Sequence, residues 1–187
     1  QSVFTPDTLY ILVWNVALPD SESGTTVAKM EEQQASWASL IQTCAPGSTV
    51  LLVASHADEV SSTELVQERC QQMLEGIHRL LQEHREAQSA ELKQILAISA
   101  NDRDIHSRRR HLQRVLERPL QLSEDVIVVS ARTLDGVATL RRRMLEVAFN
   151  KTAFPSFGAN QPNTYMTILR ELRRLHSDHS SVTWHEM

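Results

Sequence analysis

The chain has 187 residues, 41% of them apolar and 22% charged, with a formal net charge of −4. This length suits one ordinary domain plus a small appendage, and the negative balance gives no support for a nucleic-acid-binding face despite local arginine clusters. The longest apolar run, residues 9–18, falls well short of the ~20 residues that cross a bilayer, so no transmembrane segment is expected.

The two cysteines and the chain ends favour a cytoplasmic origin. Cys44 and Cys70 have no partner at a metal-binding or redox-motif spacing, so reduced thiols are the simplest interpretation. No secretory leader is visible after Gln1. The start at Gln1 and the finish at Met187 suggest a piece of a longer cytoplasmic protein.

The first half of the chain alternates strand and helix patterns. Residues 9–16 form an apolar, β-branched run typical of a strand buried on both faces. Residues 27–43 show helical spacing, and the turn residues 45–48 end that helix. Residues 49–55 then form a second buried strand.

The middle of the chain begins with a capping-box signal at residues 61–64, followed by a helix with one apolar face. The sequence pattern of residues 87–122 indicates secondary structure less clearly than that of any other part of the chain. Residues 92–98 fit either a helix end or a short extra strand. Residues 108–120 fit an exposed basic helix that Pro119 ends.

Residues 125–130 predict a third buried strand, and an Asp-Gly turn separates it from a helix over 137–149. After residue 150 several prolines and a glycine break the chain, and a short amphipathic helix follows over 165–175. This alternation predicts an α/β fold with a parallel sheet and right-handed crossovers. The predicted domains are 1–150 and a short helical extension, 151–187.

The second strand ends in Ser55, His56, Ala57 and Asp58. Open α/β sheets bind ligands at the carboxyl ends of their strands. A carboxylate there can accept the two adjacent N–H donors of a guanine edge, whereas adenine presents a lone pair that repels it. Hydrogen bonds to charged groups contribute about 1.5–3 kcal/mol each, enough for one Asp to select the base. The alternative is that Asp58 merely caps the following helix.

The third strand ends in a second small-residue motif, Ser130-Ala131-Arg132, which precedes an acidic turn and a glycine. The alternative is an ordinary strand-to-helix loop. A similar triplet, Ser99-Ala100-Asn101, follows a shorter candidate strand and lacks the glycine turn. We therefore prefer residues 130–132.

The order strand, Ser-His-x-Asp, long helix, strand, Ser-Ala-Arg, Gly, helix resembles the second half of a Ras-like GTPase. It is most similar to the Roc domain of Roco proteins, which often carry Thr-His-x-Asp where Ras has Asn-Lys-x-Asp. Residues 1–16 resemble the segment after the Asp-x-x-Gly-Gln switch motif, and residues 157–175 resemble the opening of the COR domain. The resemblance covers nearly the whole chain.

The resemblance implies a partial Ras-like P-loop GTPase fold, three-layered, with a mainly parallel sheet that lacks its first strands. It implies GTP or GDP as ligand. Asp58 would bind the guanine edge and His56 would pack against the base. Ala131 would donate a backbone N–H to the guanine carbonyl, and Ser130 would brace the loop. Ser55 and Arg132 complete the two nucleotide-binding motifs.

The chain departs from the family in having no Gly-x-x-x-x-Gly-Lys-Ser/Thr phosphate loop, no switch threonine and no Asp-x-x-Gly. No catalytic residue and no metal ligand are therefore predicted, and Mg²⁺ is expected only in a complete domain. The parent protein is expected to be a GTP-binding switch that forms homodimers through its COR region. This chain alone is expected to be inactive.

Two other functions remain open. One is a Roc-like interaction or dimerisation scaffold that binds no nucleotide, and the other is a fragment of a Roco protein serine/threonine kinase. An intact phosphate loop about 50–60 residues upstream would favour the switch, and a degenerate loop would favour the scaffold. The missing strand would pair with residues 9–16, so the chain by itself is expected to be poorly stable or prone to aggregation.

Overall fold

The computed structural model describes residues 8–17, 26–97, 103–150 and 154. The chain divides into two compact units, residues 1–154 and 155–187, and all described residues belong to the first. The predicted helix over 165–175 and the triplet at 99–101 lie outside the described residues. Within the described ranges, none of the helices has an apolar stretch that could cross a membrane.

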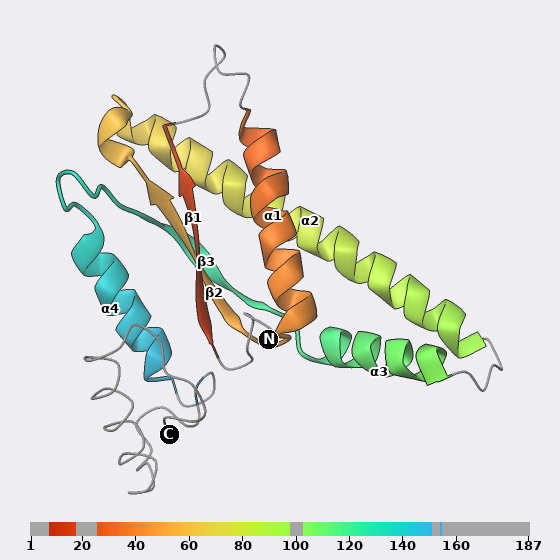
Figure 1. Ribbon diagram of the computed structural model, residues 1–187. Coiled ribbons are helices and arrows are strands. Elements are labelled where there is room, and N and C mark those ends of the chain that lie inside the picture. Colours follow the sequence, from red (N-terminus) through yellow and green to blue (C-terminus); the bar gives the residue numbers. More distant parts are fainter. Residues whose placement is uncertain (1–7, 18–25, 98–102, 151–153, 155–187) are drawn as a thin grey trace, which may run out of the picture. The chain divides into compact units, whose positions relative to one another are not determined.

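Three strands form a parallel sheet in the order in which they occur along the chain (Figure 1). They are β1 (Leu9–Asn15), β2 (Thr49–Ser55) and β3 (Gln121–Val128). β1, β2 and the second half of β3 are rich in β-branched and aliphatic residues, as strands between helical layers must be. This confirms the predicted α/β class. Because parallel strands end at one edge, the loops after β2 and β3 meet there.

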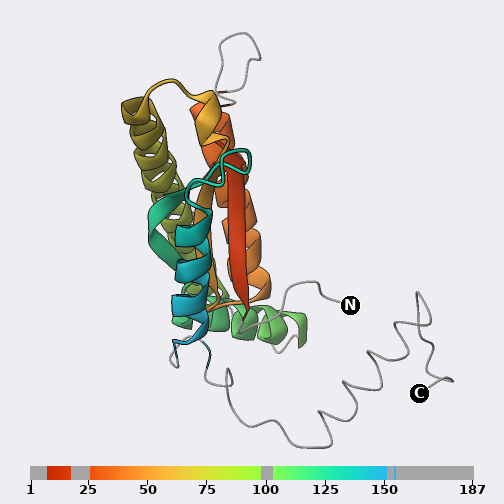
Figure 2. The same ribbon diagram turned by 90° about the vertical axis from the view of Figure 1, so that its left-hand side faces the viewer.

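Two helices, α1 (Val27–Cys44) and α2 (Thr63–Ala97), cover one face of the sheet (Figures 1 and 2). The Thr26 hydroxyl caps α1 by accepting from the Lys29 backbone N–H at 3.3 Å. The core of this layer joins alternate residues of β1 and β2 to apolar residues of both helices: Leu12, Trp14, Ala38, Ile41, Leu52, Met73 and Ile77.

The beginning of α2 decides one of the alternatives for Asp58. The Ser62 hydroxyl accepts from the Leu65 backbone N–H at 3.2 Å and donates to the Glu64 carboxylate at 2.7 Å. Ser62 therefore caps α2, and Asp58 lies in a separate short 3₁₀ turn, η1 (Ala57–Glu59). The interpretation of Asp58 as the cap of this helix is wrong.

The helix α2 continues to Ala97, so residues 92–97 belong to it and are not an extra strand. Its second half extends beyond the sheet, and α3 (Arg103–Glu117) packs alongside it (Figure 1). Both segments are built from good helix formers such as Glu, Gln, Arg and Leu. Pro119 lies just after α3, as predicted for the residue that stops this helix.

The opposite face of the sheet is covered by α4 (Val137–Ala148), which makes the domain three-layered. Leu140 and Val147 of α4 pack on a small core of Leu51, Val53, Ile127 and Val129. We predicted that β1 is buried on both faces, but Val13 is 54% exposed. The reason is that β1 lies at one edge of the described sheet, where α4 covers this face only in part.

Candidate functional site

The carboxyl end of β2 holds Ser55 and His56 against the neighbouring strand. The Ser55 hydroxyl donates to the Trp14 carbonyl oxygen of β1 at 3.0 Å and lies 3.0 Å from His56 Nδ1. A serine hydroxyl has one proton, so Nδ1 must carry the hydrogen in this second contact. Ser55 therefore orients the His56 ring and connects β1 to β2, so its own hydroxyl is already engaged.

His56 turns the chain sharply where β2 ends. Its backbone is in the left-handed region, with φ 61° and ψ 33°, which few residues other than glycine adopt. The Glu59 N–H donates to the His56 carbonyl at 3.2 Å and closes η1. This turn places the side chain of Asp58 on the exposed carboxyl edge of the sheet. Strained residues of this kind cluster at functional sites.

The structure brings Asp58 and Ser130 together, although they follow different strands. The two loops are joined by the backbone, since Val129 N–H donates to the Ala54 carbonyl at 2.8 Å. Ser130 is buried, and the hydrogen bond from its side chain to the Asp58 carboxylate lowers the pKa of Asp58 from its ordinary value of 3.8. The charges of Arg132 and His56 lower that pKa further.

The loop after β3 is fixed by short-range hydrogen bonds. The Ser130 hydroxyl accepts from the Thr133 N–H at 3.0 Å, and the Ser130 N–H donates to the Asp135 carbonyl at 3.0 Å. Gly136 has φ +72°, and a Cβ there would lie 1.9 Å from the Val128 carbonyl oxygen. Only glycine fits this close approach.

Asp135 of the predicted Asp-Gly turn and Thr133, which was not predicted to matter, shape the same loop. The Thr133 hydroxyl donates to the Asp135 carboxylate at 2.6 Å and accepts from the Asp135 N–H at 3.3 Å. Thr and Asp two positions apart before a glycine are typical turn residues, so this signal was present in the sequence. The exposed Ala131 N–H is left without an acceptor among the described residues.

We call Ser55, His56, Asp58, Ser130, Ala131 and Arg132 the strand-end cluster. It offers an ionised carboxylate as acceptor and a backbone N–H as donor, beside an imidazole ring of fixed orientation. These groups are suited to a planar ligand that has adjacent N–H donors and a carbonyl. In residues 8–17, 26–97 and 103–150, no three His, Cys, Asp or Glu side chains gather to hold a metal ion.

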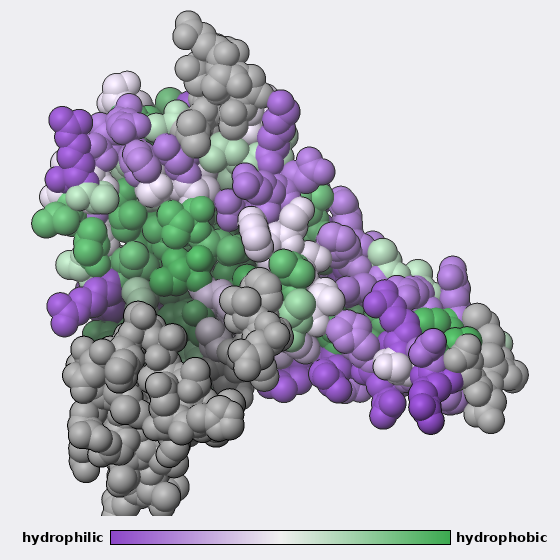
Figure 3. Space-filling model, in the orientation of Figure 1, coloured by the Kyte–Doolittle hydropathy of each residue, from purple (hydrophilic) through white to green (hydrophobic). Residues whose placement is uncertain are grey.

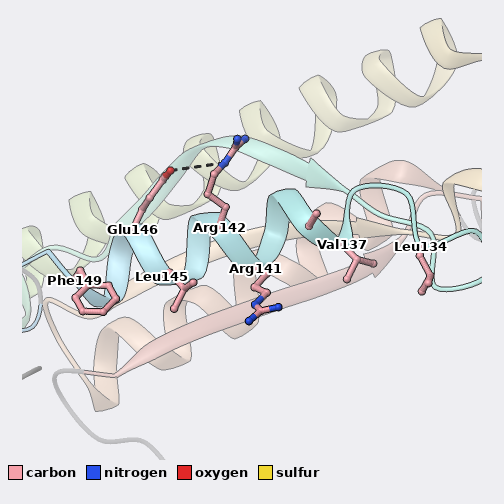
Figure 4. A pocket seen from close by; sticks show the side chains of 8 residues that line it. Leu134, Val137, Arg141, Arg142, Leu145, Glu146 and Phe149 are labelled. Atoms are coloured by element: carbon pink, nitrogen blue, oxygen red, sulfur yellow. Dashed lines mark ion pairs between the residues drawn. The ribbon is translucent and has the colours of Figure 1, made fainter.

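A large open hollow of the described surface lies elsewhere, along α4 (Figure 4). We call it the α4 groove. It has a volume of about 840 Å³, and its wall is mostly apolar. Arg142 and Glu146 lie on one side of the helix, 3.9 Å apart, and Leu145 lies on the other (Figure 4). The residues that line the groove are Leu134, Val137, Ala138, Arg141, Arg142, Leu145, Glu146 and Phe149.

The α4 groove belongs to a wider hydrophobic surface on this side of the sheet (Figure 3). Val13 of β1 is 54% exposed, Leu145 is 47% exposed and Leu134 is 69% exposed. Large contiguous apolar patches on a protein surface mark places where another surface packs. The mostly apolar wall of the α4 groove distinguishes it from the polar strand-end cluster.

Comparison with known proteins gives one distant relative. The chain is 27% identical over 185 residues to "Malignant fibrous histiocytoma-amplified sequence 1" of Homo sapiens, an alignment that covers 90% of this chain. The chain spans 17% of the length of that human protein. No protein-family model matches the chain. No solved structure matches it.

Proposed function

We propose that the strand-end cluster recognises the guanine base of GTP or GDP, as part of a Ras-like domain of the Roc type. The observation that carries the proposal is the backbone pairing of the loops after β2 and β3, in which Val129 N–H donates to the Ala54 carbonyl at 2.8 Å and Ala57 N–H donates to the Val129 carbonyl at 3.4 Å. It joins the two motifs that a guanine site requires at one edge of one sheet. If the two motifs lay far apart, no single base could contact both of them.

The charge state of Asp58 suits this role. Its lowered pKa keeps the carboxyl ionised at neutral pH, so it acts only as a hydrogen-bond acceptor. The N1–H and the exocyclic amine of guanine are two adjacent donors. Adenine would place a lone pair against the carboxylate. The free Ala131 N–H is the complementary donor for the guanine carbonyl, and the His56 ring would lie beside the base.

The order of the sheet is compatible with this fold. In a right-handed doubly wound sheet, helices on the two faces lead in opposite directions. Here α1 and α2 lead from β1 towards β3 on one face, and α4 follows β3 on the other. We propose that a phosphate-binding half, with its Mg²⁺, pairs with β1 and packs on the hydrophobic surface beside α4. Residues 151–187 would begin a COR-like dimerisation module of a cytoplasmic protein.

Base contacts alone predict weak binding. Two hydrogen bonds to a charged group, at about 1.5–3 kcal/mol each, correspond to a dissociation constant on the order of 1 mM. NMR titration of the intact chain with guanosine and adenosine monophosphates tests this. We expect guanosine monophosphate to shift the amide signals of residues 56–58 and 130–132. Equal shifts with both nucleotides, or shifts confined to α4, would contradict the proposal.

A scaffold that binds no nucleotide is the second candidate, and the exposed α4 groove favours it. The two candidate functions predict different NMR responses of residues 56–58 to added nucleotide. A scaffold predicts no base-dependent change at these amides at any ligand concentration. An intact phosphate loop in the upstream sequence would favour the switch, and a degenerate one the scaffold.

A further inference from the structure

The helix α3 is strongly basic in an acidic chain. It contains five arginines, two acidic residues and no lysine. The whole chain has a formal net charge of −4 and α3 contributes +3, so the rest of the chain carries −7. The positive charge is therefore concentrated on one element, and α3 leads into the amino-terminal end of β3, away from the strand-end cluster.

Three of these arginines form one row on the solvent side of α3. At 3.6 residues per turn, Arg103, Arg110 and Arg114 fall within about 40° of one another and span about 16 Å. All three are exposed, and Leu112 on the opposite side is 1% exposed. We call these three residues the arginine row.

The arginine row has no counter-ion within the described part of the chain. None of its three guanidinium groups forms an ion pair or hydrogen bond with a residue in 8–17, 26–97 or 103–150. Arg108, one turn away on the inner side, shows the contrast. It makes two hydrogen bonds to the Glu91 carboxylate of α2, at 2.7 and 2.9 Å. Arg108 joins the two helices, whereas the three guanidinium groups of the row are exposed.

The surroundings of the row argue against a lipid or nucleic-acid ligand. An interfacial helix inserts its apolar face into the membrane, but the apolar face of α3 is buried in the domain through Leu112 and Val115. The side chains beside the row are polar, with His106 and Ser107 among them, and α3 contains no Phe, Tyr or Trp on which bases could stack.

We propose that the arginine row docks an acidic helical segment of another protein. A guanidinium group pairs with a carboxylate through two parallel hydrogen bonds, which a lysine cannot match. A facing helix with carboxylates at the same intervals, i, i+7 and i+11, presents three partners along the row. Such exposed pairs set the orientation and association rate of a complex, and they weaken as salt rises.

The test uses the intact chain and a fluorescent synthetic helical peptide with glutamates at positions i, i+7 and i+11. A second peptide has glutamine at those positions. Arg110→Gln/Arg114→Gln removes two charges from the row, and Arg141→Gln/Arg142→Gln removes two from α4 as the matched control. Binding is followed by fluorescence anisotropy at about 0.01 M ionic strength, where screening is weak. Circular dichroism confirms that each variant is folded.

We expect the row variant to bind the glutamate peptide about 3- to 10-fold more weakly, as the loss of two exposed ion pairs predicts. The α4 control should bind like the parent chain, and the glutamine peptide should not bind. Equal binding by the parent and the row variant would overturn the proposal. Stronger, row-dependent binding to phosphatidylserine vesicles or to duplex DNA would overturn it as well, because it would assign the row to another ligand.

Discussion

Ser130, at the end of β3, lies close enough to Asp58, at the end of β2, for its side chain to lower the pKa of the Asp58 carboxyl. Ser130 lies in the core and also accepts a backbone N–H from Thr133, so its position is fixed from both sides. Asp58 is exposed. An ionised acceptor thus lies on the exposed edge of the sheet beside a loop of fixed position, which is the arrangement that a base-recognition site needs.

The substitution Asp58→Ala is expected to weaken nucleotide binding without changing the stability of the fold. Because Asp58 is exposed and does not cap α2, we expect the melting temperature of the ligand-free chain to change little. Guanosine monophosphate binding should fall at least tenfold, since at least one charged hydrogen bond is lost. Calorimetry and NMR titration of the same sample measure both effects. Equal losses of stability and binding would assign a structural role to Asp58.

The pKa of Asp58 reports the Ser130 contact. In the folded chain this pKa lies below 3.8, so the contact stabilises the fold above that pH. This stabilisation is lost as the pH falls through the folded-state pKa. We expect Ser130→Ala to raise the pKa of Asp58 towards 3.8, and Ser130→Thr to preserve the lowered value. Carboxyl ¹³C NMR titration measures it. An unchanged pKa in Ser130→Ala would mean that the hydroxyl does not reach Asp58.

Gly136 is expected to be the least replaceable of the glycines in the described residues, Gly47, Gly76 and Gly136. An added Cβ would lie 1.9 Å from the Val128 carbonyl oxygen, and φ is +72°. Gly136→Ala should cost about 1–2 kcal/mol for the left-handed backbone alone, and more because β3 must move. Gly47→Ala is the matched control, because φ there is +85° but the nearest atoms belong to the flexible Arg118 side chain. Urea denaturation measures the free energy of unfolding of both variants, and an equal loss in the two would contradict this prediction.

The hydrophobic surface beside α4 predicts self-association of the isolated chain. The exposed fractions of Val13 and Leu145, 54% and 47%, leave apolar area next to an edge strand. Leu145→Gln should reduce the average mass seen by light scattering. Leu96→Gln, which removes a side chain of similar exposure from the end of α2, should not. A monomeric parent chain with a sharp, reversible melt would contradict the prediction.

Most of the fold could be predicted because apolar periodicity is strong where helices pack on the sheet. Residues 49–55 and 137–148 are examples, since each contributes to a core that demands apolar residues. The beginning of β3 was missed by four residues, because Gln121–Asp125 is polar except for Leu122 and lies at the edge of the described sheet. The length of α2 was missed because its second half leaves the sheet and has no continuous apolar stripe.

The strand-end cluster could be predicted in part. The rule that parallel strands end at one edge is sufficient to bring Asp58 and Ser130 together. The left-handed backbone of His56 and the bond from Ser55 to the Trp14 carbonyl depend on the neighbouring strand. Neither feature can be inferred from the spacing of residue types along the chain. Leu134 is another exposed residue with a positive φ of 65°, and no sequence rule expects a bulky side chain there.

Reversal of base preference tests the central claim most directly. Asp58→Asn presents an amide donor where the parent presents a carboxylate oxygen, and xanthine has a carbonyl where guanine has its exocyclic amine. Titration of both proteins with guanosine and xanthosine monophosphates compares the four affinities. We predict that the parent chain prefers guanine and Asp58→Asn prefers xanthine. An unchanged preference for guanine in the variant would show that Asp58 does not contact the base.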